Sequence, residues 1–206
     1  MLELFDTIPL TIQHPYYINL IGQNNSYNTI TENISIGDYL SSYTPFDIVI
    51  NLNYPDNRAP YHGMSGVKHK LNNEKTIYIL SIGILDYKDE NIISLIRNLF
   101  PKIRDLMTYI TKDLTKDLEK FATPKILFHC YAGISRSSTI AIAYLAKTLH
   151  KSVYEIYNIV KSKRNCIRPN HGFVKKLIEY DNIRIVDDMI DKIREERQTK
   201  DKLKNN

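Results

Sequence analysis

Cys130 and Arg136 are separated by five residues, in a segment suited to nucleophilic chemistry on an anion. The short apolar run 125–128 before them is typical of a strand, and the amphipathic stretch 137–149 after them is typical of a helix. A tight loop between a strand and a helix directs several backbone N–H groups to one point at the positive end of the helix. The segment therefore predicts a binding loop for an anion such as phosphate.

The residue types inside this loop fit that interpretation. Gly133 lets the backbone turn without a Cβ clash, and Arg136 offers a planar guanidinium that holds two phosphate oxygens together. The helix end and Arg136 both favour Cys130 as a thiolate, which is a competent nucleophile. Ser137 comes next, and its hydroxyl can donate a hydrogen bond to the sulfur when the sulfur acts as a leaving group.

Strands and helices are expected to alternate along the chain. Runs rich in β-branched residues predict strands at 34–36, 47–52 and 76–84. Apolar residues three and four positions apart, together with helix-start signals, predict further helices over 91–118, 152–163 and 173–194. This alternation is typical of an α/β fold, and we expect a single domain whose mainly parallel central sheet is flanked by helices.

Three local features sharpen this prediction. Pro101 lies inside the first of the three further helices and is expected to kink or divide it. Ser152 and Glu155 fit a capping box at the start of the next helix. His62 and His69 belong to a polar stretch that we interpret as a surface loop.

The composition indicates an intracellular globular protein. The chain has 206 residues, of which 43% are hydrophobic and 25% charged, which suits one compact domain. No stretch approaches the roughly 20 apolar residues of a membrane helix, and the N-terminus has no signal-peptide pattern. We therefore expect a protein of the cytoplasm or nucleus, with Cys130 and Cys166 as reduced thiols and Cys166 in a structural role.

The formal net charge of +5 weakly favours anionic partners. Part of the excess lies in 192–204, where basic and acidic residues alternate, and we interpret this stretch as solvated. A patch for nucleic acid or acidic lipid is the alternative, although no nucleic-acid partner is expected. His and Cys are scattered along the sequence, so it predicts no metal site, and we expect no cofactor.

The loop and its neighbours resemble a known signature. His129-Cys130, Ala132-Gly133 and Ser135-Arg136-Ser137 are similar to the protein tyrosine phosphatase superfamily, and this Ala-Gly-x-Ser-Arg-Ser variant resembles its dual-specificity branch. Further similarities follow in the family's order at 34–40, 46–53, 82–86 and 169–173. The resemblance covers about residues 30–180. It implies a cysteine-dependent phosphoric monoester hydrolase whose mechanism requires no metal.

The resemblance also implies a role for each matching residue. Cys130 would be the nucleophile that becomes a phosphocysteine, and Asp86 would protonate the leaving oxygen. Phosphate would be bound by Tyr131, Ala132, Gly133, Ile134, Ser135 and Arg136. Supporting roles would fall to His129, Ser137 and Asn170.

Asp89 is the alternative general acid. The stretch between Asp86 and Cys130 is longer than is usual in the family, and we expect the extra length within 112–122. Asp86 is preferred because the Ile-x-Ile-x pattern before it and Asn91-Ile92 after it match the family's acid loop. Asn170 is expected mainly to close a turn, with bracing of the phosphate loop as a second role.

These observations favour a protein phosphatase that acts on phosphotyrosine and phosphoserine/threonine in phosphoprotein substrates. A phosphatase of RNA 5′ ends or phosphoinositides is the first alternative, disfavoured because 131–135 contains no basic residue. A non-catalytic phosphoprotein-binding module is the second, disfavoured because Cys130 and Arg136 are both present. We expect an N-terminal segment at 1–29, the catalytic domain at 30–185 and a charged C-terminal helix or tail at 186–206.

Overall fold

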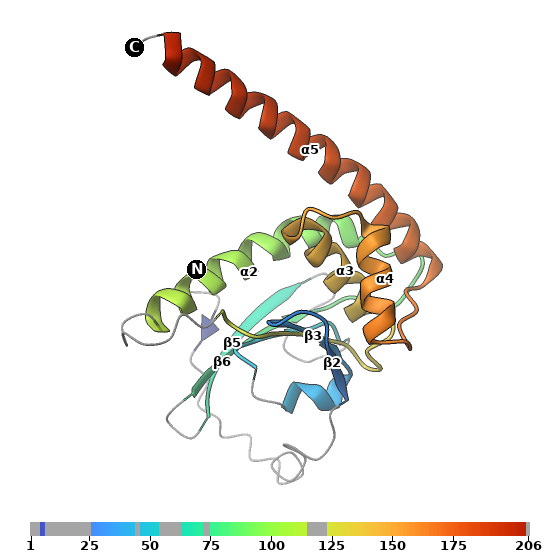
Figure 1. Cartoon of the computed structure of the whole chain (residues 1–206). Helices are drawn as coiled ribbons and strands as arrows, with labels where there is room; N and C mark the ends of the chain where they lie inside the picture. Colours follow the sequence, from blue (N-terminus) through green and yellow to red (C-terminus); the bar gives the residue numbers. More distant parts are fainter. Residues whose placement is uncertain are drawn as a thin grey trace.

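A central sheet carries the candidate loop at the carboxyl ends of its parallel strands. Helices pack against the sheet (Figure 1). The computed structural model describes residues 5–6, 26–43, 46–53, 63–71, 75–114 and 123–204. Within this part of the chain, seven strands form one sheet in the order β1-β5-β6-β4-β7-β3-β2. Their bounds are β1 Phe5–Asp6, β2 Tyr27–Thr29, β3 Ile34–Gly37, β4 Ile48–Asn51, β5 Met64–Leu71, β6 Lys75–Ile82 and β7 Ile126–His129.

The helices of the described chain follow the expected order. They are the short 3-10 helix η2 Tyr39–Tyr43, then α2 Ile92–Leu114, α3 Arg136–Thr148, α4 Val153–Lys163 and α5 His171–Lys204. Figure 1 shows α2, α3, α4 and the start of α5 grouped on one side of the sheet. The α/β architecture predicted from the alternating patterns is therefore confirmed.

The middle of the sheet is parallel, and this determines where the loop lies. Strands β6, β4, β7 and β3 pair in parallel, whereas β2 and β5 pair antiparallel with their neighbours β3 and β6. His129 at the end of β7 lies opposite Gly37 of β3 and Asn51 of β4. Cys130 therefore leaves the sheet at the carboxyl edge of its parallel strands, the edge at which α/β sheets bind ligands.

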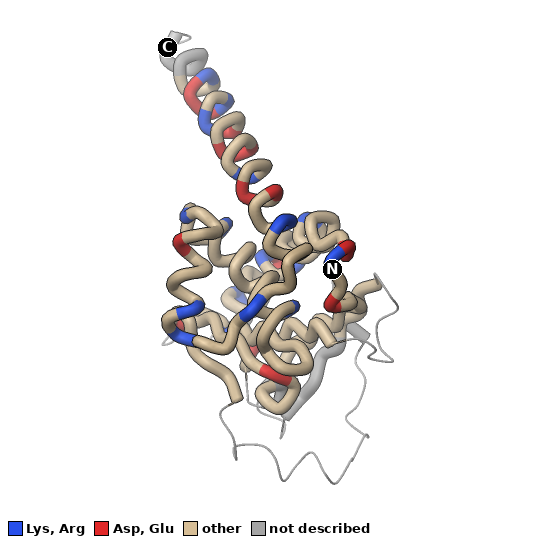
Figure 2. The backbone as a smooth tube through the Cα atoms, turned by 90° about the vertical axis from the view of Figure 1, so that its right-hand side faces the viewer, with Lys and Arg blue, Asp and Glu red and all other residues tan. Residues whose placement is uncertain are grey.

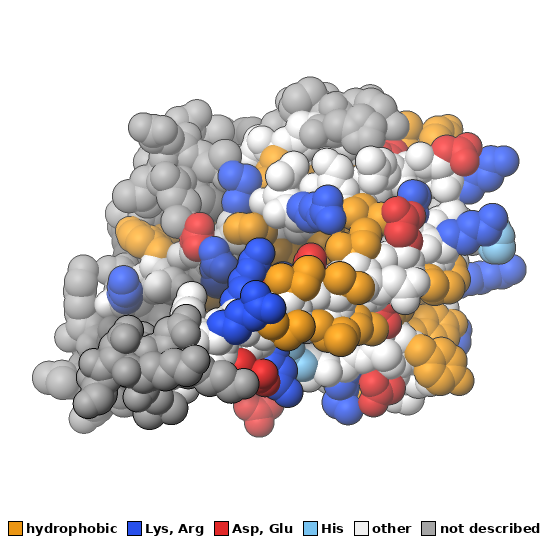
Figure 3. Space-filling view, turned by 90° about the horizontal axis from the view of Figure 1, so that it is seen from above, with side chains coloured by type: hydrophobic (Ala, Val, Ile, Leu, Met, Phe, Trp, Pro, Cys, Tyr) orange, Lys and Arg blue, Asp and Glu red, His pale blue; other side chains and the backbone are white. Residues whose placement is uncertain are grey.

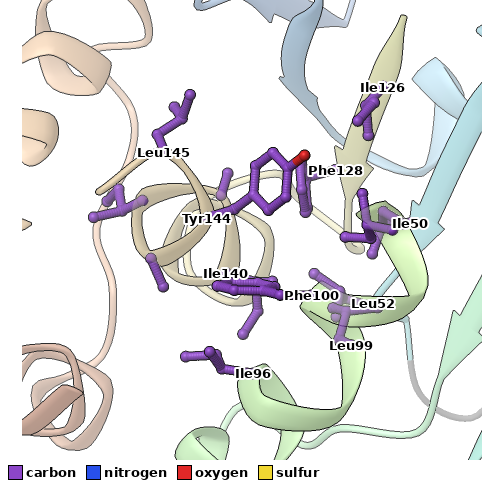
Figure 4. Close-up of a cluster of buried hydrophobic side chains, with 14 of the residues drawn as sticks. Ile50, Leu52, Ile96, Leu99, Phe100, Ile126, Phe128, Ile140, Tyr144 and Leu145 are labelled. Carbon is purple, nitrogen blue, oxygen red and sulfur yellow. The ribbon is translucent and has the colours of Figure 1, made fainter. Parts of the chain in front are cut away.

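An aromatic and aliphatic core holds α2 and α3 against the sheet. Phe100 of α2 meets Tyr144 of α3 edge to face, with ring centroids 5.3 Å apart, and Tyr144 also packs on Phe128 of β7 (Figure 4). Ile50 and Ile140 are fully buried in the same cluster. This packing fixes the start of α3, and with it the loop that precedes α3, relative to the strand ends.

Two local predictions can be compared directly with the structure. The capping box is confirmed, because Ser152 Oγ accepts from the Glu155 N–H at 3.2 Å and the Glu155 carboxylate accepts from the Ser152 N–H at 3.0 Å. Of the two alternatives expected for Pro101, a kink or a division of the helix, the division is wrong, because α2 is continuous through Pro101. Buried Leu99 and Ile103 anchor the helix on both sides of the exposed proline.

The prediction of a surface loop around His69 is also wrong. Residues 64–71 form β5, in which His69 pairs with Ile77 of β6. Backbone hydrogen bonds to a neighbouring strand can hold a polar segment in a sheet. Such a segment has no apolar alternation, so its sequence does not indicate a strand. Phe5–Asp6 of the N-terminal segment pairs in parallel with the other side of β5, whereas His62 lies outside the described residues.

Helix α5 is longer than expected and ends at Lys204. Its second half extends away from the sheet (Figure 1), and acidic and basic residues alternate along it (Figure 2). Residues 186–204 thus belong to this last helix. Among the helices that the structure describes, none has both the length and the apolar character to cross a membrane.

Candidate active site

The loop 131–135 surrounds a buried cysteine between β7 and α3. The Cys130 side chain is only 3% exposed, and its Sγ lies 3.3 Å from Ser137 Oγ in the first turn of α3. His129 is buried beside it, and its carbonyl accepts from the Leu52 N–H at 2.9 Å. The sequence-predicted pair Cys130 and Ser137 therefore meets as a sulfur and a hydroxyl within hydrogen-bonding distance.

All five carbonyls of residues 131–135 accept hydrogen bonds from residues outside this loop. Tyr131 O accepts from the Tyr39 N–H at 3.2 Å, and Ile134 O accepts from the Arg168 N–H at 2.9 Å. Arg164 donates to the other two carbonyls before Ser135, those of Ala132 and Gly133. Ser135 O accepts from the hydroxyls of Ser138 and Thr139 and from the Thr139 N–H.

The backbone N–H groups of the same loop are available to donate hydrogen bonds to a ligand. None of the described residues accepts a hydrogen bond from the N–H groups of 131–135. Arg136, at the start of α3, donates through Nη1 to Ile84 O at 3.3 Å, and its buried Nε has no partner among the described residues. A loop at a helix start whose carbonyls are occupied and whose N–H groups lack an acceptor can serve as an anion cradle.

Gly133 is needed for this conformation. Its φ is +66°, in the left-handed region that residues with a Cβ rarely adopt. A Cβ at this position would also lie 2.6 Å from the backbone of Gly37 and 2.5 Å from the Arg164 guanidinium. The sequence prediction that a glycine allows the turn is confirmed, and the close approach of β3 adds a second reason.

Arg164 holds the loop through its backbone carbonyls. The sequence analysis did not predict this role. It is buried, and it donates through Nε to Gly133 O at 2.9 Å and through Nη1 to Asn28 Oδ1 at 2.7 Å. The guanidinium thus ties the loop to the edge strand β2. No local signal identifies it, because Arg164 ends an ordinary basic run at the C-terminal end of α4 and its partners are distant in sequence.

Replacing Arg164 by alanine is expected to lower both stability and phosphate binding. The change removes several hydrogen bonds from a charged donor and leaves Gly133 O and Ala132 O without this partner, so unfolding should become easier by about 2–4 kcal/mol. Chemical denaturation would measure this loss, with exposed Lys175→Ala as the control. An Arg164→Ala variant as stable as wild type would contradict the assigned support.

Asp86 is the acid that the structure brings to the loop. Its Oδ1 accepts from Ser135 Oγ and from Asn170 Nδ2, both at 2.7 Å. The Asn170 N–H in turn donates to Ser135 Oγ at 3.1 Å, which closes a three-residue network. Asp89 is exposed and has no hydrogen bond to a described residue of the phosphate loop.

Asn170 has both of the roles considered for it. Its Oδ1 accepts from the Phe173 N–H at 2.9 Å and so caps the start of α5. Its Nδ2 faces the other way and holds Asp86. Asn170 therefore joins the acid loop, the phosphate loop and the last helix at one point.

Two further residues hold the loop that carries Asp86, which we call the acid loop. Neither was assigned to the site from the sequence. Glu90 is buried, and its carboxylate accepts from the Leu85 N–H at 3.3 Å. Gly172, in the first turn of α5, lies so close to Lys88 that a Cβ would overlap the Lys88 backbone. The loop that carries Asp86 thus rests directly on the helix start that Asn170 caps.

A Gly172→Ala variant is expected to push this loop away from the cradle. Because the added methyl meets backbone atoms of Lys88, the loop or the helix start has to shift, and Asp86 would lose its short contacts. Hydrolysis of a phosphomonoester should fall about tenfold to a hundredfold, with little change in the binding of an inert oxyanion such as tungstate. Unchanged kcat would contradict this coupling.

Aromatic and apolar side chains border the loop. The rings of Tyr39 and Tyr131 stack with centroids 5.5 Å apart, and both side chains are exposed. Ile134, in the loop itself, is also exposed. Cys166 and His171 are exposed and take no part in the hydrogen-bond network described above. In the part of the chain that the structure describes, no group of His, Cys, Asp or Glu is arranged to hold a metal ion.

Comparisons with known proteins bear on the family of this chain. Residues 31–183 match the model of the dual specificity phosphatase catalytic domain. A putative tyrosine phosphatase of Invertebrate iridescent virus 6 is 40% identical over 80 residues, covering 34% of this chain and 56% of the viral protein. Human dual specificity protein phosphatase 14 is 53% identical over 55 residues, covering 27% of this chain and 28% of that protein. The matched parts thus span about half of the viral relative and under a third of the human one.

A solved structure shows the same fold over nearly its whole length. The human tyrosine phosphatase-like serine/threonine/tyrosine-interacting protein superposes with a TM-score of 0.53 at 27% identity, covering 77% of this chain and 97% of that chain. The family match extends over most of the described residues and includes the cradle, the acid loop and Asn170. The chain therefore belongs to the dual-specificity phosphatase family.

Proposed function

We propose that this chain is a protein phosphatase that hydrolyses phosphotyrosine and phosphoserine/threonine through a phosphocysteine intermediate. One observation carries the proposal. The five carbonyls of 131–135 accept hydrogen bonds from residues outside this loop and their N–H groups have no acceptor among the described residues, around a buried thiol. Such a cradle suits the three terminal oxygens of a phosphate monoester, and family membership supports it.

In the first step, the Cys130 thiolate attacks phosphorus opposite the leaving oxygen. The S–P bond forms, the bond from phosphorus to the leaving oxygen breaks, and Asp86 gives its proton to that oxygen. The loop N–H groups and Arg136 stabilise the equatorial oxygens throughout. The contacts from Ser135 and Asn170 support Asp86 in this role, because they hold its carboxyl at the loop.

In the second step, water replaces the sulfur. The Asp86 carboxylate accepts a proton from the water, whose oxygen attacks phosphorus while the S–P bond breaks. Inorganic phosphate leaves, and Cys130 returns to the thiolate. Ser137 Oγ, 3.3 Å from Sγ, is placed to donate a hydrogen bond to the departing sulfur. His129 is proposed to fix the position of the cysteine from within the core.

We propose phosphoproteins as substrates and residues 30–185 as the catalytic unit. The loop interior offers no basic side chain beyond Arg136 for the extra phosphates of an RNA 5′ end or a phosphoinositide head group. The buried Cys130 and the Arg136 guanidinium favour an enzyme over a pure binding module. Because the thiolate must stay reduced, we propose that the protein acts in the cytoplasm or nucleus.

Hydrolysis of substrate panels tests the proposed function. The full chain would be incubated, with a metal chelator present, with phosphotyrosine and phosphothreonine peptides, a 5′-phosphorylated RNA and a phosphoinositide. We expect phosphate release from the peptides at rates at least tenfold above those of the other two substrates. Faster release from RNA or from the lipid would overturn the substrate class. A folded protein that binds phosphopeptides without turnover would instead indicate the binding module.

A further inference from the structure

Helix α5 continues well beyond the part of it that packs against the domain. Its buried residues are three or four positions apart and so share one face of the helix: Phe173, Leu177, Tyr180 and Arg184. On this face, Arg184 donates to Lys151 O at 3.0 Å. From 185 to 199 every residue is exposed, and Figure 1 shows this part of α5 projecting away from the sheet and the other helices. Within the described chain, no residue therefore covers the helix from 185 to 199.

The projecting part of α5 carries an apolar surface. Side chains three, four or seven positions apart lie on the same side of a helix. Six apolar side chains, each between 41% and 60% exposed, are spaced in this way: Ile178, Ile185, Val186, Met189, Ile190 and Ile193. At about 100° per residue, their side of the helix is opposite to the buried face. We call these six residues the apolar stripe.

The apolar stripe has the character of a packing surface. An apolar stripe on the helix of a soluble protein faces a packing partner, and a contiguous exposed apolar patch marks an interaction site. Seen from above, hydrophobic side chains gather on the helical face with Lys and Arg side chains beside them (Figure 3). By the same helical geometry, Asp187, Asp188 and Asp191 lie outside the stripe, and Asp191 pairs there with Arg194 at 3.2 Å. Acids thus border the apolar stripe without interrupting it.

The charge of α5 changes sign along the helix. From 178 to 191 the sequence has five acidic residues and one arginine, whereas from 192 to 204 it has six basic and three acidic residues. Two such helices packed side by side in opposite directions place the acidic part of each against the basic part of the other. In the same direction, like charges would face each other. Charges beside an apolar seam select the orientation of the partner in this way, so a second copy of this chain complements the apolar stripe.

We propose that two copies of this chain associate through their apolar stripes, with the two α5 helices antiparallel. Glu179 and Arg197 are 18 residues apart, about five full turns, so they lie on one edge of the helix. In the antiparallel pair, Glu179 meets Arg197 of the partner subunit at each end of the interface. The same register places Val186 opposite Ile190 of the partner subunit in the middle. Glu179 also lies 2.7 Å from Lys176 of its own helix, and its two oxygens can accept from both cations.

This association is independent of the phosphatase chemistry, because the apolar stripe shares no residue with the cradle or the acid loop. Sedimentation velocity of the full chain across a dilution series tests it. At about 100 µM we expect a species of twice the mass of one chain, which dissociates on dilution. A chain that stays monomeric at this concentration would overturn the proposal. Binding of that monomer to phosphatidylserine vesicles would assign the apolar stripe to a membrane surface instead.

Ile193→Glu, with Gln198→Glu as its matched control, tests whether the apolar stripe is the interface. Both residues are exposed on the projecting helix, Ile193 on the apolar stripe and Gln198 on the far side. We expect Ile193→Glu to weaken dimerisation at least about tenfold, because it buries an unpaired carboxylate at the interface. Gln198→Glu should stay within about twofold of wild type. Equal effects of the two changes, or no effect of Ile193→Glu, would contradict an interface at the apolar stripe.

Disulfide cross-linking determines the direction of the two helices. In chains whose Cys130 and Cys166 are replaced by serine, Glu179→Cys would be mixed with Arg197→Cys and oxidised. We expect disulfide-linked dimers in the mixture but not from either variant alone, because equivalent positions in the antiparallel pair lie roughly 27 Å apart. Linkage of Glu179→Cys to a second copy of itself would show parallel helices and overturn the proposed arrangement.

Discussion

Replacing Cys130 by serine is expected to lower turnover of every phosphomonoester by at least about a thousandfold while leaving the fold intact. The substitution exchanges one buried atom, so packing around β7 and α3 should persist. A serine hydroxyl remains protonated at neutral pH and is a far weaker nucleophile than a thiolate, which removes the covalent step. Steady-state hydrolysis of an aryl phosphate measures the loss.

The control for this variant is Cys166→Ser. Cys166 is exposed and outside the cradle, so its replacement should keep kcat within about twofold. Cys130→Ser should also still bind phosphopeptide, because the loop N–H groups and Arg136 remain. Retained turnover in Cys130→Ser, or equal losses in both variants, would exclude Cys130 as the nucleophile.

Replacing Asp86 by asparagine is expected to lower kcat for phosphopeptides by about a hundredfold to a thousandfold. Asparagine keeps an oxygen that accepts from Ser135 and Asn170, so the loop should hold its position while the acidic proton is lost. The loss should be smaller for an aryl phosphate whose leaving group is already stable as an anion. Comparing the two substrates therefore isolates the proton transfer.

Asp89→Asn provides the matched control. Asp89 is exposed in the same loop without a hydrogen bond to a described residue of the cradle, so its variant should stay within about threefold of wild type. If Asp89→Asn instead lost activity in proportion to leaving-group basicity, while Asp86→Asn did not, the acid assignment would be reversed.

The sequence predicted those site residues that lie close together along the chain. Cys130, Gly133, Arg136 and Ser137 fall within one strand-loop-helix unit, whose geometry follows from hydrophobic patterning and turn chemistry. Asp86 required more, because its place depends on how two loops distant in sequence meet. The family resemblance supplied that link, and Ser135 and Asn170 show the contacts behind it.

The features that the sequence did not predict depend on tertiary contacts that leave no periodic pattern in the sequence. Arg164 acts on backbone carbonyls, which any residue could supply, and Glu90 accepts from a backbone N–H. Strand β5 lacks apolar alternation, so its sequence gives no strand signal, and it is recognised only by its backbone pairing with β6 and, at Gly66 and Val67, with β1.

The most direct test of the proposed mechanism is to trap the covalent intermediate. The full chain would be mixed rapidly with a phosphotyrosine peptide carrying labelled phosphate, denatured within milliseconds, digested and analysed by mass spectrometry. We expect labelled phosphate on the peptide that contains Cys130, and none on the same peptide of Cys130→Ser. The amount of label should rise under conditions that slow the hydrolysis of the phosphocysteine by water. Rapid turnover with no label on Cys130, or label on another residue, would contradict a phosphocysteine mechanism.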